Sequence, residues 1–459
     1  MRRASPLASL LILVAVIASA FASKVIAAPA QATPPDVRAR AELLVDHLAA
    51  GRFDDVAGMF DEKMRAALPA DKLRLAWVAT EQAAGAFERR GSVRTDTRNG
   101  FDIAIVTCAF ARNSVDVQIA FNGRSEVGGL SFRPAPPAVA AAPAGPLPYK
   151  GAFSYVDREV TTGVDGWPLP GTLTMPAGAG PFPAVVLVHG SGPQDRDATL
   201  GPNKVFRDLA AGLASHGIAV LRYTKRTQQH AGRAMALTNL TVKEEATEDA
   251  LAAVALLRRT AGIDATRVFV LGHSMGGTLA PRIAAEDPAL AGLIVLAGAT
   301  KSLEQSLVEQ TRYLSMADGD LSDADRDQLM RVEQLAAQVR ALTPADAGKG
   351  ESIGGAPASY WLDLRGYNPA ALASRLPHPF LVLQGERDYQ VTMADFARWR
   401  AALESRANVT LRSYPALNHI FMAGSGPSLP AEYLVPGHVD VQVVDDIARW
   451  IAGVTPRRP

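Results

Sequence analysis

A serine set between a strand-like run and a helix-like run is the feature that most constrains this chain. Residues 268–271 are apolar and rich in β-branched types, which is typical of a buried strand. The run stops at Gly272-His-Ser-Met-Gly276, which fits G-x-S-x-G, and residues 278–286 read as a helix. In this context the pattern holds a serine nucleophile in strained geometry above a sheet. A chance match is the alternative, and the strand-to-helix context argues against it, so we predict that Ser274 is catalytic.

The serine needs partners, because its hydroxyl is a weak nucleophile at neutral pH without a base and an orienting carboxylate. Two downstream residues follow strand-like runs: Asp388, after the run ending at Gly385, and His419, after the run ending at Tyr414. Open α/β sheets bind ligands on the side where the carboxyl ends of their strands lie. We therefore predict that His419 is the base and that the loop containing Asp388 supplies the acid.

Several residues compete for these roles. Glu386 lies two residues before Asp388 and is an alternative acid, which the residues alone leave open. His378 precedes its strand, which places it at the opposite edge of the sheet, and His438 begins the last predicted helix. We interpret His273, next to the nucleophile, as a structural residue.

The reaction also needs hydrogen-bond donors for the negative charge that develops on the substrate oxygen. One predicted donor is the backbone N–H of Met275, directly after the nucleophile. The second is expected in the loop His189-Gly-Ser-Gly-Pro-Gln-Asp-Arg-Asp197, which follows another strand-like run. Its proline has no N–H, so Gly190, Ser191 or Gly192 must donate, and of these we favour Ser191. No GK[ST] follows these glycines, which argues against a phosphate-binding loop.

The surrounding pattern predicts an α/β domain over residues 149–455. Strand-like and helix-like runs alternate there, which implies a mostly parallel sheet with helices on both faces. The alternation stops at about residues 301–377, a span too long for a plain connection. We call these residues the cap segment and predict that they form a helical cap. Tyr360 and Trp361, near its end, are predicted to line a substrate pocket, with core packing as the alternative.

Residues 35–134 are predicted to form a separate small α+β domain. Helix-like runs come first, and strand-like runs such as residues 115–121 follow, with Asn122-Gly123 as a favourable hairpin turn. We see no catalytic constellation in this part of the chain. The stretch of residues 135–148 is rich in proline and alanine and is predicted to be an extended, semi-rigid linker.

The first 32 residues predict export. Two arginines precede an apolar run over residues 6–21, and small residues with A-x-A-like spacing follow up to Ala32. A membrane-spanning helix needs about 20 apolar residues, so a signal peptide is favoured over an uncleaved anchor. We expect a periplasmic or secreted mature protein. The single cysteine, Cys108, permits no intrachain disulfide, and a large core does not require one.

The composition excludes little but gives no sign of a charged partner. The net charge is +1, so neither nucleic acid nor an anionic membrane surface is indicated. No H-E-x-x-H or other cluster of metal ligands occurs in the sequence, and we expect neither a metal nor a cofactor.

Four segments together resemble a known family: residues 189–197, 272–276, 385–388 and 418–419. Over roughly residues 150–455 the chain resembles secreted bacterial α/β-hydrolases of the EstD-type carboxylesterase group, and it is similar to dienelactone-hydrolase-like and serine-aminopeptidase-like sequences. A small domain similar to the nuclear-transport-factor-like fold also precedes the hydrolase domain in that group.

This resemblance implies an α/β-hydrolase fold and a carboxylesterase that cleaves a small-molecule ester. It places the triad on Ser274, Asp388 and His419 and so favours Asp388 over Glu386. Dienelactone hydrolases use a cysteine nucleophile, and the serine here argues against that activity. The chain departs from the family pattern Tyr-Asp-Lys-Arg-Gly at residues 223–227, Tyr-Thr-Lys-Arg-Thr, which leaves the substrate preference open.

Two other functions stay open at this point. A serine peptidase or amidase would use the same chemistry on the same fold, and the sequence does not separate it from an esterase. A non-catalytic binding protein on a hydrolase scaffold, with the N-terminal domain as its working part, is the second alternative. The apparently intact triad argues against this second reading.

Overall fold

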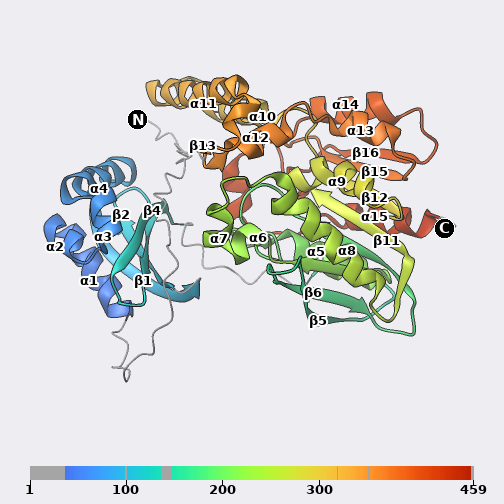
Figure 1. Cartoon of the computed structure of the whole chain (residues 1–459), viewed down its shortest axis with the longest axis horizontal. Coiled ribbons are helices and arrows are strands. Elements are labelled where there is room, and N and C mark those ends of the chain that lie inside the picture. Colours follow the sequence, from blue (N-terminus) through green and yellow to red (C-terminus); the bar gives the residue numbers. More distant parts are fainter. Residues whose placement is uncertain (1–36, 99–100, 136–146, 318, 350–351, 456–459) are drawn as a thin grey trace. The chain divides into compact units, whose positions relative to one another are not determined.

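The structure is a computed structural model that describes residues 37–98, 101–135, 147–317, 319–349 and 352–455 (Figure 1). The chain divides into two compact units at residues 141 and 142. The predicted signal peptide, residues 1–32, and most of the predicted linker, residues 135–148, lie outside the described residues. Among the helices that are described, none combines the length and the apolar character needed to cross a membrane.

The N-terminal unit consists of helices followed by an antiparallel sheet, as the sequence predicts. The strands follow one another in the order β1-β2-β3-β4, each antiparallel to its neighbour. The elements are α1 (Val37–Ala49), α2 (Phe53–Gly58), α3 (Glu62–Ala67), α4 (Ala70–Ala84), β1 (Phe87–Arg98), β2 (Phe101–Phe110), β3 (Ser114–Phe121) and β4 (Val127–Pro134).

Strand β1 is the element that the sequence does not predict in this unit. It contains several arginines and a glycine, and its pairing with β2 has two register shifts, so the apolar–polar alternation typical of a strand is lost. Trp77 of α4 packs against the rings of Phe87, Phe110 and Phe132, at centroid distances of 5.7, 5.6 and 5.8 Å. This aromatic cluster joins the last helix to the sheet.

The C-terminal unit is built on an eight-stranded sheet. Its order is β16-β15-β12-β11-β7-β10-β6-β5, and the five pairings from β16 to β10 are all parallel. The predicted opening pair, β5 and β6, is antiparallel and lies at one edge. The strands are β5 (Tyr155–Thr162), β6 (Leu169–Pro176), β7 (Phe182–Val188), β10 (Ala219–Tyr223), β11 (Ile263–His273), β12 (Gly292–Leu296), β15 (Phe380–Gly385) and β16 (Val409–Tyr414).

Helices cover both faces of this sheet. Successive residues of each central strand point to opposite faces, so Val185 of β7 packs under α5 (Val205–Ser215) and α15 (Val441–Gly453), while Val186 packs on the other side. That other side is covered by α8 (Glu248–Arg258), α9 (Met275–Glu286), α13 (Pro369–Arg375) and α14 (Met393–Leu403). The α/β prediction is confirmed.

The cap segment contains helices and a small hairpin, which Figure 1 shows gathered in orange on one side of the C-terminal unit. One helix inside the predicted range, α13, packs on the sheet with α9 and α14 and so belongs to the layered core. The other elements of the segment are α10 (Leu303–Ser315), α11 (Asp323–Ala341), η2 (Pro344–Asp346), β13 (Ser352–Ile353), β14 (Ala356–Pro357) and α12 (Ala358–Leu364).

Short elements complete the unit between the strands. A π-helical turn, η1, directly precedes α8. Such turns interrupt regular helices and occur frequently at functional sites. The short elements are β8 (Thr199–Leu200), β9 (Asn203–Lys204), α6 (Arg226–Gln229), α7 (Ala231–Met235), η1 (Lys243–Thr247) and η3 (Pro430–Leu434).

Candidate functional site

Ser274 occupies the sharp turn between β11 and α9. Its backbone angles are φ 55° and ψ −119°, a conformation that L-amino acids rarely adopt, and its N–H donates to Leu296 O at 2.9 Å. A β-carbon at Gly272 would lie 2.1 Å from Gly276 O, and one at Gly276 would lie 2.2 Å from Val188 O. Only glycine fits these two positions, which explains why the motif requires them and how the strand and helix approach so closely.

His419 and Asp388 form a buried pair at the carboxyl ends of β16 and β15. The Nδ1–H of His419 donates to Asp388 Oδ2 at 2.7 Å. The other carboxylate oxygen accepts the backbone N–H groups of Gln390 and Val391 at 2.7 and 3.0 Å, which fixes its orientation. Because Nδ1 holds the proton in this arrangement, Nε2 of the neutral ring is the acceptor nitrogen. An imidazole with a free acceptor and a carboxylate behind it can serve as a general base.

His273 connects this pair to the turn that carries Ser274. Its Nε2–H donates to the main-chain oxygen of His419 at 2.9 Å, and the two rings lie 4.8 Å apart. Burial, followed by the neighbouring His419, lowers the pKa of His273 to about 4, so this ring is neutral near pH 7. The contact holds His419 beside the residue that precedes Ser274, which agrees with the structural role predicted for His273.

The competing residues have other partners. Glu386 accepts a hydrogen bond from the hydroxyl of Ser413 at 2.7 Å, whereas Asp388 faces His419. His438 pairs with Asp208 at 3.0 Å. His378 is buried, and its Nε2–H donates to a main-chain oxygen at 3.2 Å. In this geometry the pair with a free imidazole nitrogen next to the turn is His419 with Asp388.

The loop after β7 passes directly beside Ser274. A β-carbon at Gly190 would lie 3.1 Å from Ser274 Cβ, so the main chain of this loop borders the serine. His189 anchors the loop, because its Nε2–H donates to Asp195 O at 2.9 Å. Burial and then the nearby Lys225 lower the pKa of His189 to about 3, so it also stays neutral. Met275 begins α9, and its N–H lies at the helix N-terminus, where unpaired amides favour negative charge.

A buried ionic network lies behind this loop, and sequence reasoning missed it. The Lys225 ammonium donates to Gly190 O at 2.8 Å and to Glu245 Oε1 at 2.6 Å. The Tyr360 hydroxyl donates to Glu245 Oε2 at 2.6 Å and lies 3.2 Å from Met275 Sδ. Lys225 belongs to the segment 223–227, where the chain departs from the family pattern, and that segment was the one available signal.

The two residues predicted to line a substrate pocket are both buried, Tyr360 against η1 and α9 and Trp361 against the cap segment itself. Tyr360 is 7% exposed and contacts an apolar cluster that includes Leu279, and Trp361 is 5% exposed. The indole N–H of Trp361 donates to Ile353 O at 2.9 Å, within the same segment. This burial favours the alternative of packing, and for Tyr360 it adds the contact with Glu245.

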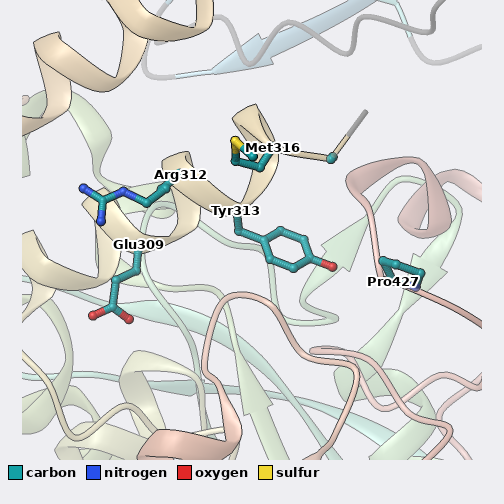
Figure 2. Close-up of a pocket in the computed structure, with 6 residues that line it drawn as sticks. Glu309, Arg312, Tyr313, Met316 and Pro427 are labelled. Carbon is teal, nitrogen blue, oxygen red and sulfur yellow. The ribbon is translucent and has the colours of Figure 1, made fainter. Parts of the chain in front are cut away.

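A pocket of about 460 Å³ lies at the C-terminal end of α10. Figure 2 shows side chains that line it. The ring of Tyr313 stacks on that of Tyr389 at 5.1 Å, and Tyr389 directly follows Asp388 in the chain. The pocket therefore lies next to the loop that carries Asp388. The lining residues are Glu309, Arg312, Tyr313, Met316, Ala317 and Pro427.

No group of three or more histidine, cysteine, aspartate or glutamate side chains in the described ranges is arranged to hold a metal ion.

Comparisons with known proteins agree with this architecture. Residues 185–432 match the family described as Alpha/beta hydrolase family, and residues 41–130 match one described as Protein of unknown function (DUF3887). The chain is 38% identical over 409 residues to Esterase EstD of Thermotoga maritima, which covers 89% of this chain and 94% of that protein.

Solved structures are more distant. Est1E from Butyrivibrio proteoclasticus is 17% identical, with a TM-score of 0.40, over 64% of this chain and 99% of its own. The Pyrococcus horikoshii acylaminoacyl peptidase is 13% identical, with a TM-score of 0.45, over 81% of this chain and 57% of its own. Likeness of this degree carries no information on activity. The family match over more than half of the chain and the similarity to EstD over most of it do carry such information. The chain belongs to the alpha/beta hydrolase family, and we call its C-terminal unit the hydrolase unit.

Proposed function

We propose that this protein is a serine esterase that cleaves small carboxylic esters with Ser274, His419 and Asp388. The observation that carries the proposal is the buried hydrogen bond from His419 to Asp388, next to a serine held at positive φ. The similarity to a protein named Esterase EstD supports an ester rather than another acyl substrate.

The geometry supports a two-step reaction. Ser274 Oγ attacks the ester carbonyl carbon while its proton passes to Nε2 of His419, and Asp388 stabilises the resulting imidazolium. His419 then returns the proton to the leaving alcohol oxygen as the carbon–oxygen bond breaks, which leaves an acyl group on the serine. A water molecule, deprotonated by the same histidine, attacks the acyl carbon and releases the carboxylic acid and free Ser274.

The backbone amides of Met275 and Ser191 are proposed to donate to the oxyanion. Met275 is the first residue of α9, and the Gly190–Ser191 peptide lies beside the nucleophile. Removal of one such donor typically costs about 10²- to 10³-fold in kcat. Gly190 then serves a steric purpose, because any side chain there would meet Ser274.

The apolar part of the ester is proposed to enter the pocket of Figure 2 rather than to contact Tyr360 or Trp361. The pocket lies beside the loop that carries Asp388, whereas the other two side chains are buried.

Covalent labelling tests the central claim. A fluorophosphonate should label the wild-type protein at Ser274 and should not label Ser274→Ala. Nitrophenyl esters of graded acyl length, compared with aminoacyl anilides, then separate an esterase from a peptidase or amidase. A folded wild-type protein that is neither labelled nor active on any of these substrates would support the non-catalytic alternative.

We also propose that the mature protein is exported, to the periplasm or beyond. The support is the sequence of residues 1–32, with its arginines, apolar run and small residues. N-terminal sequencing of the protein recovered from fractionated cells tests this: a mature chain that begins before residue 20 would contradict it.

A further inference from the structure

We propose that Lys225 is a positioning residue that orients and polarises the Gly190–Ser191 peptide, so that the Ser191 N–H faces the substrate oxyanion. The inference rests on the proposed esterase function and assigns a role to a buried network that the triad chemistry does not use. The network comprises Lys225, Glu245 and Tyr360.

The geometry of the peptide bond links Lys225 to the Ser191 N–H. In a trans peptide the C=O of one residue and the N–H of the next point in opposite directions. The Lys225 ammonium donates to Gly190 O at 2.8 Å. The Ser191 N–H must therefore point away from Lys225. A β-carbon at Gly190 would lie 3.1 Å from Ser274 Cβ, so this peptide borders the nucleophile. Fixing the carbonyl therefore fixes the direction of the neighbouring donor.

The charge on the ammonium adds to this effect. A hydrogen bond from an ionised donor is stronger than one between neutral groups, and hydrogen bonds in a chain polarise one another. An ammonium on the carbonyl oxygen draws electron density from the amide and makes its N–H a better donor. A rigid, polarised donor stabilises the tetrahedral state without reorganisation at the moment of reaction.

The burial of Lys225 is costly and is balanced by one carboxylate. Lys225 is 2% exposed, and Glu245, 5% exposed, accepts its second hydrogen bond at 2.6 Å. A buried ion pair often contributes no more to stability than apolar residues of the same size. Stability alone therefore gives a weak reason for a lysine at this place, whereas its bond to Gly190 O gives a specific one.

Glu245 connects the same network to the second proposed donor. Its other oxygen accepts the Tyr360 hydroxyl at 2.6 Å, and that hydroxyl lies 3.2 Å from Met275 Sδ. Tyr360 belongs to α12 of the cap segment, and Glu245 lies on η1. The carbonyl oxygen of the Gly190–Ser191 peptide and the side chain of Met275 are thus both in contact with one network that also includes the cap segment.

The first experiment compares Lys225→Met with a matched control, Arg226→Met. Arg226 is the next residue, is 1% exposed and pairs with Asp249 at 2.5 Å, but bonds to its carboxylate partners rather than to the loop after β7. On a short nitrophenyl ester, Lys225→Met should lower kcat by about 10- to 100-fold with KM changed less than threefold, since a misaligned donor costs less than the 10²- to 10³-fold of a lost one. Arg226→Met should keep kcat within threefold.

The second measurement separates positioning from stability. A trifluoromethyl ketone forms a tetrahedral oxyanion adduct with the serine, so its affinity should fall in Lys225→Met by the same factor as kcat/KM. The double variant Lys225→Met, Glu245→Gln removes both charges and keeps an acceptor for Tyr360. It should recover thermal stability and yet keep the low kcat.

The outcomes are distinguishable from a failure of the proposed function. If wild type hydrolyses esters and Lys225→Met is folded with kcat within twofold of wild type, the positioning role is wrong and the esterase proposal stands. Recovery of kcat together with stability in the double variant, or an equal loss in Arg226→Met, overturns the inference in favour of a structural pair. A wild-type protein that no fluorophosphonate labels overturns the proposed function itself.

Discussion

The two units of this chain differ in what they bury. In the described part of the N-terminal unit, the buried residues are apolar or glycine, and its ion pairs, such as Arg90 with Asp46, are half-exposed or exposed. The hydrolase unit also has an apolar core, but it buries His189, Lys225 and His419 along one end of its sheet, together with other charged groups. Burial of a polar or charged group is costly unless it is paired.

The difference indicates where this molecule does its chemistry. The N-terminal unit has an apolar interior, and its described charged groups are partly or fully exposed. The hydrolase unit buries a histidine–aspartate pair and a lysine–glutamate pair, and both are linked to residues that adjoin Ser274. Buried ionisable groups that converge on one place are typical of functional sites. Each prediction below tests this contrast, from the largest expected effect to the smallest.

The largest effect is expected from His419→Ala, with His438→Ala as its control. Both histidines bond through Nδ1 to a buried aspartate, at 2.7 and 3.0 Å. Loss of the base should lower kcat by about 10⁵-fold, since removal of the base disables the whole triad. The control should destabilise the fold by about 1–3 kcal/mol and leave kcat within threefold. Equal losses of kcat would mean that burial, and not position at the site, determines the effect.

Asp388→Asn should be nearly as damaging. The amide can favour the wrong tautomer of His419, and kcat is expected to fall by about 10⁴-fold. Glu386→Gln, two residues earlier, alters a carboxylate that bonds to Ser413, and should leave the ester hydrolysis rate within twofold. Steady-state assays on both purified variants decide between the two acids; a larger loss in Glu386→Gln would reassign the triad.

Trp77→Ala tests the other side of the comparison. Trp77 is 3% exposed and packs among three phenylalanine rings, so the cavity should destabilise the N-terminal unit by about 3–5 kcal/mol. Calorimetry should show an earlier transition for this unit, while kcat on a small nitrophenyl ester stays within twofold. A parallel loss of kcat would show that the N-terminal unit takes part in catalysis.

Acid should destabilise the hydrolase unit selectively. The pKa of His273 is lowered to about 4 and that of His189 to about 3, whereas an unfolded histidine titrates near 6.5. The unfolded chain therefore binds more protons as the pH falls from about 6.5 toward 4, and stability falls with it by up to about 1.4 kcal/mol per pH unit for each histidine. Urea denaturation at a series of pH values should show that the free energy of unfolding of His273→Gln depends less steeply on pH than that of the wild type. An unchanged dependence on pH would contradict the lowered pKa of His273.

The smallest effect is expected at the pocket beside the Asp388 loop. Met316→Glu places a charge in this lining and should reduce kcat/KM for a long acyl ester about three- to tenfold relative to an acetyl ester, because buried CH₂ groups contribute about 0.8 kcal/mol each. Met330→Glu is the control, since Met330 is also about half exposed but lies on α11, outside the pocket lining. The same chain-length profile in both variants would exclude the pocket from substrate binding.

The sequence predicts those parts of the site that follow from local pattern. The strand-to-helix context of Ser274 and the strand ends before Asp388 and His419 come from neighbouring residues, and sheet topology then brings them to one edge. The order of strands and helices along the chain is predicted in the same way, because buried parallel strands form recognisable apolar runs.

The remaining features depend on pairing between distant residues. Lys225 meets Glu245 and Gly190 only because β10 lies next to β7 and η1 packs nearby, which no local pattern encodes. Strand β1 lacks apolar alternation, and its register shifts come from its partner β2. The burial of Tyr360 and Trp361 likewise depends on how the cap segment folds, which composition does not determine.

The unusual backbone of Ser274 has a consequence for the evolution of this enzyme. A side chain at φ 55° costs of order 1–3 kcal/mol, a cost that glycine at the same position would not have. The replacement that most relieves this turn therefore abolishes the nucleophile. Selection for heat resistance alone should therefore favour variants with glycine at position 274, which are more stable and inactive. Only continuous selection on turnover keeps the strained serine in place.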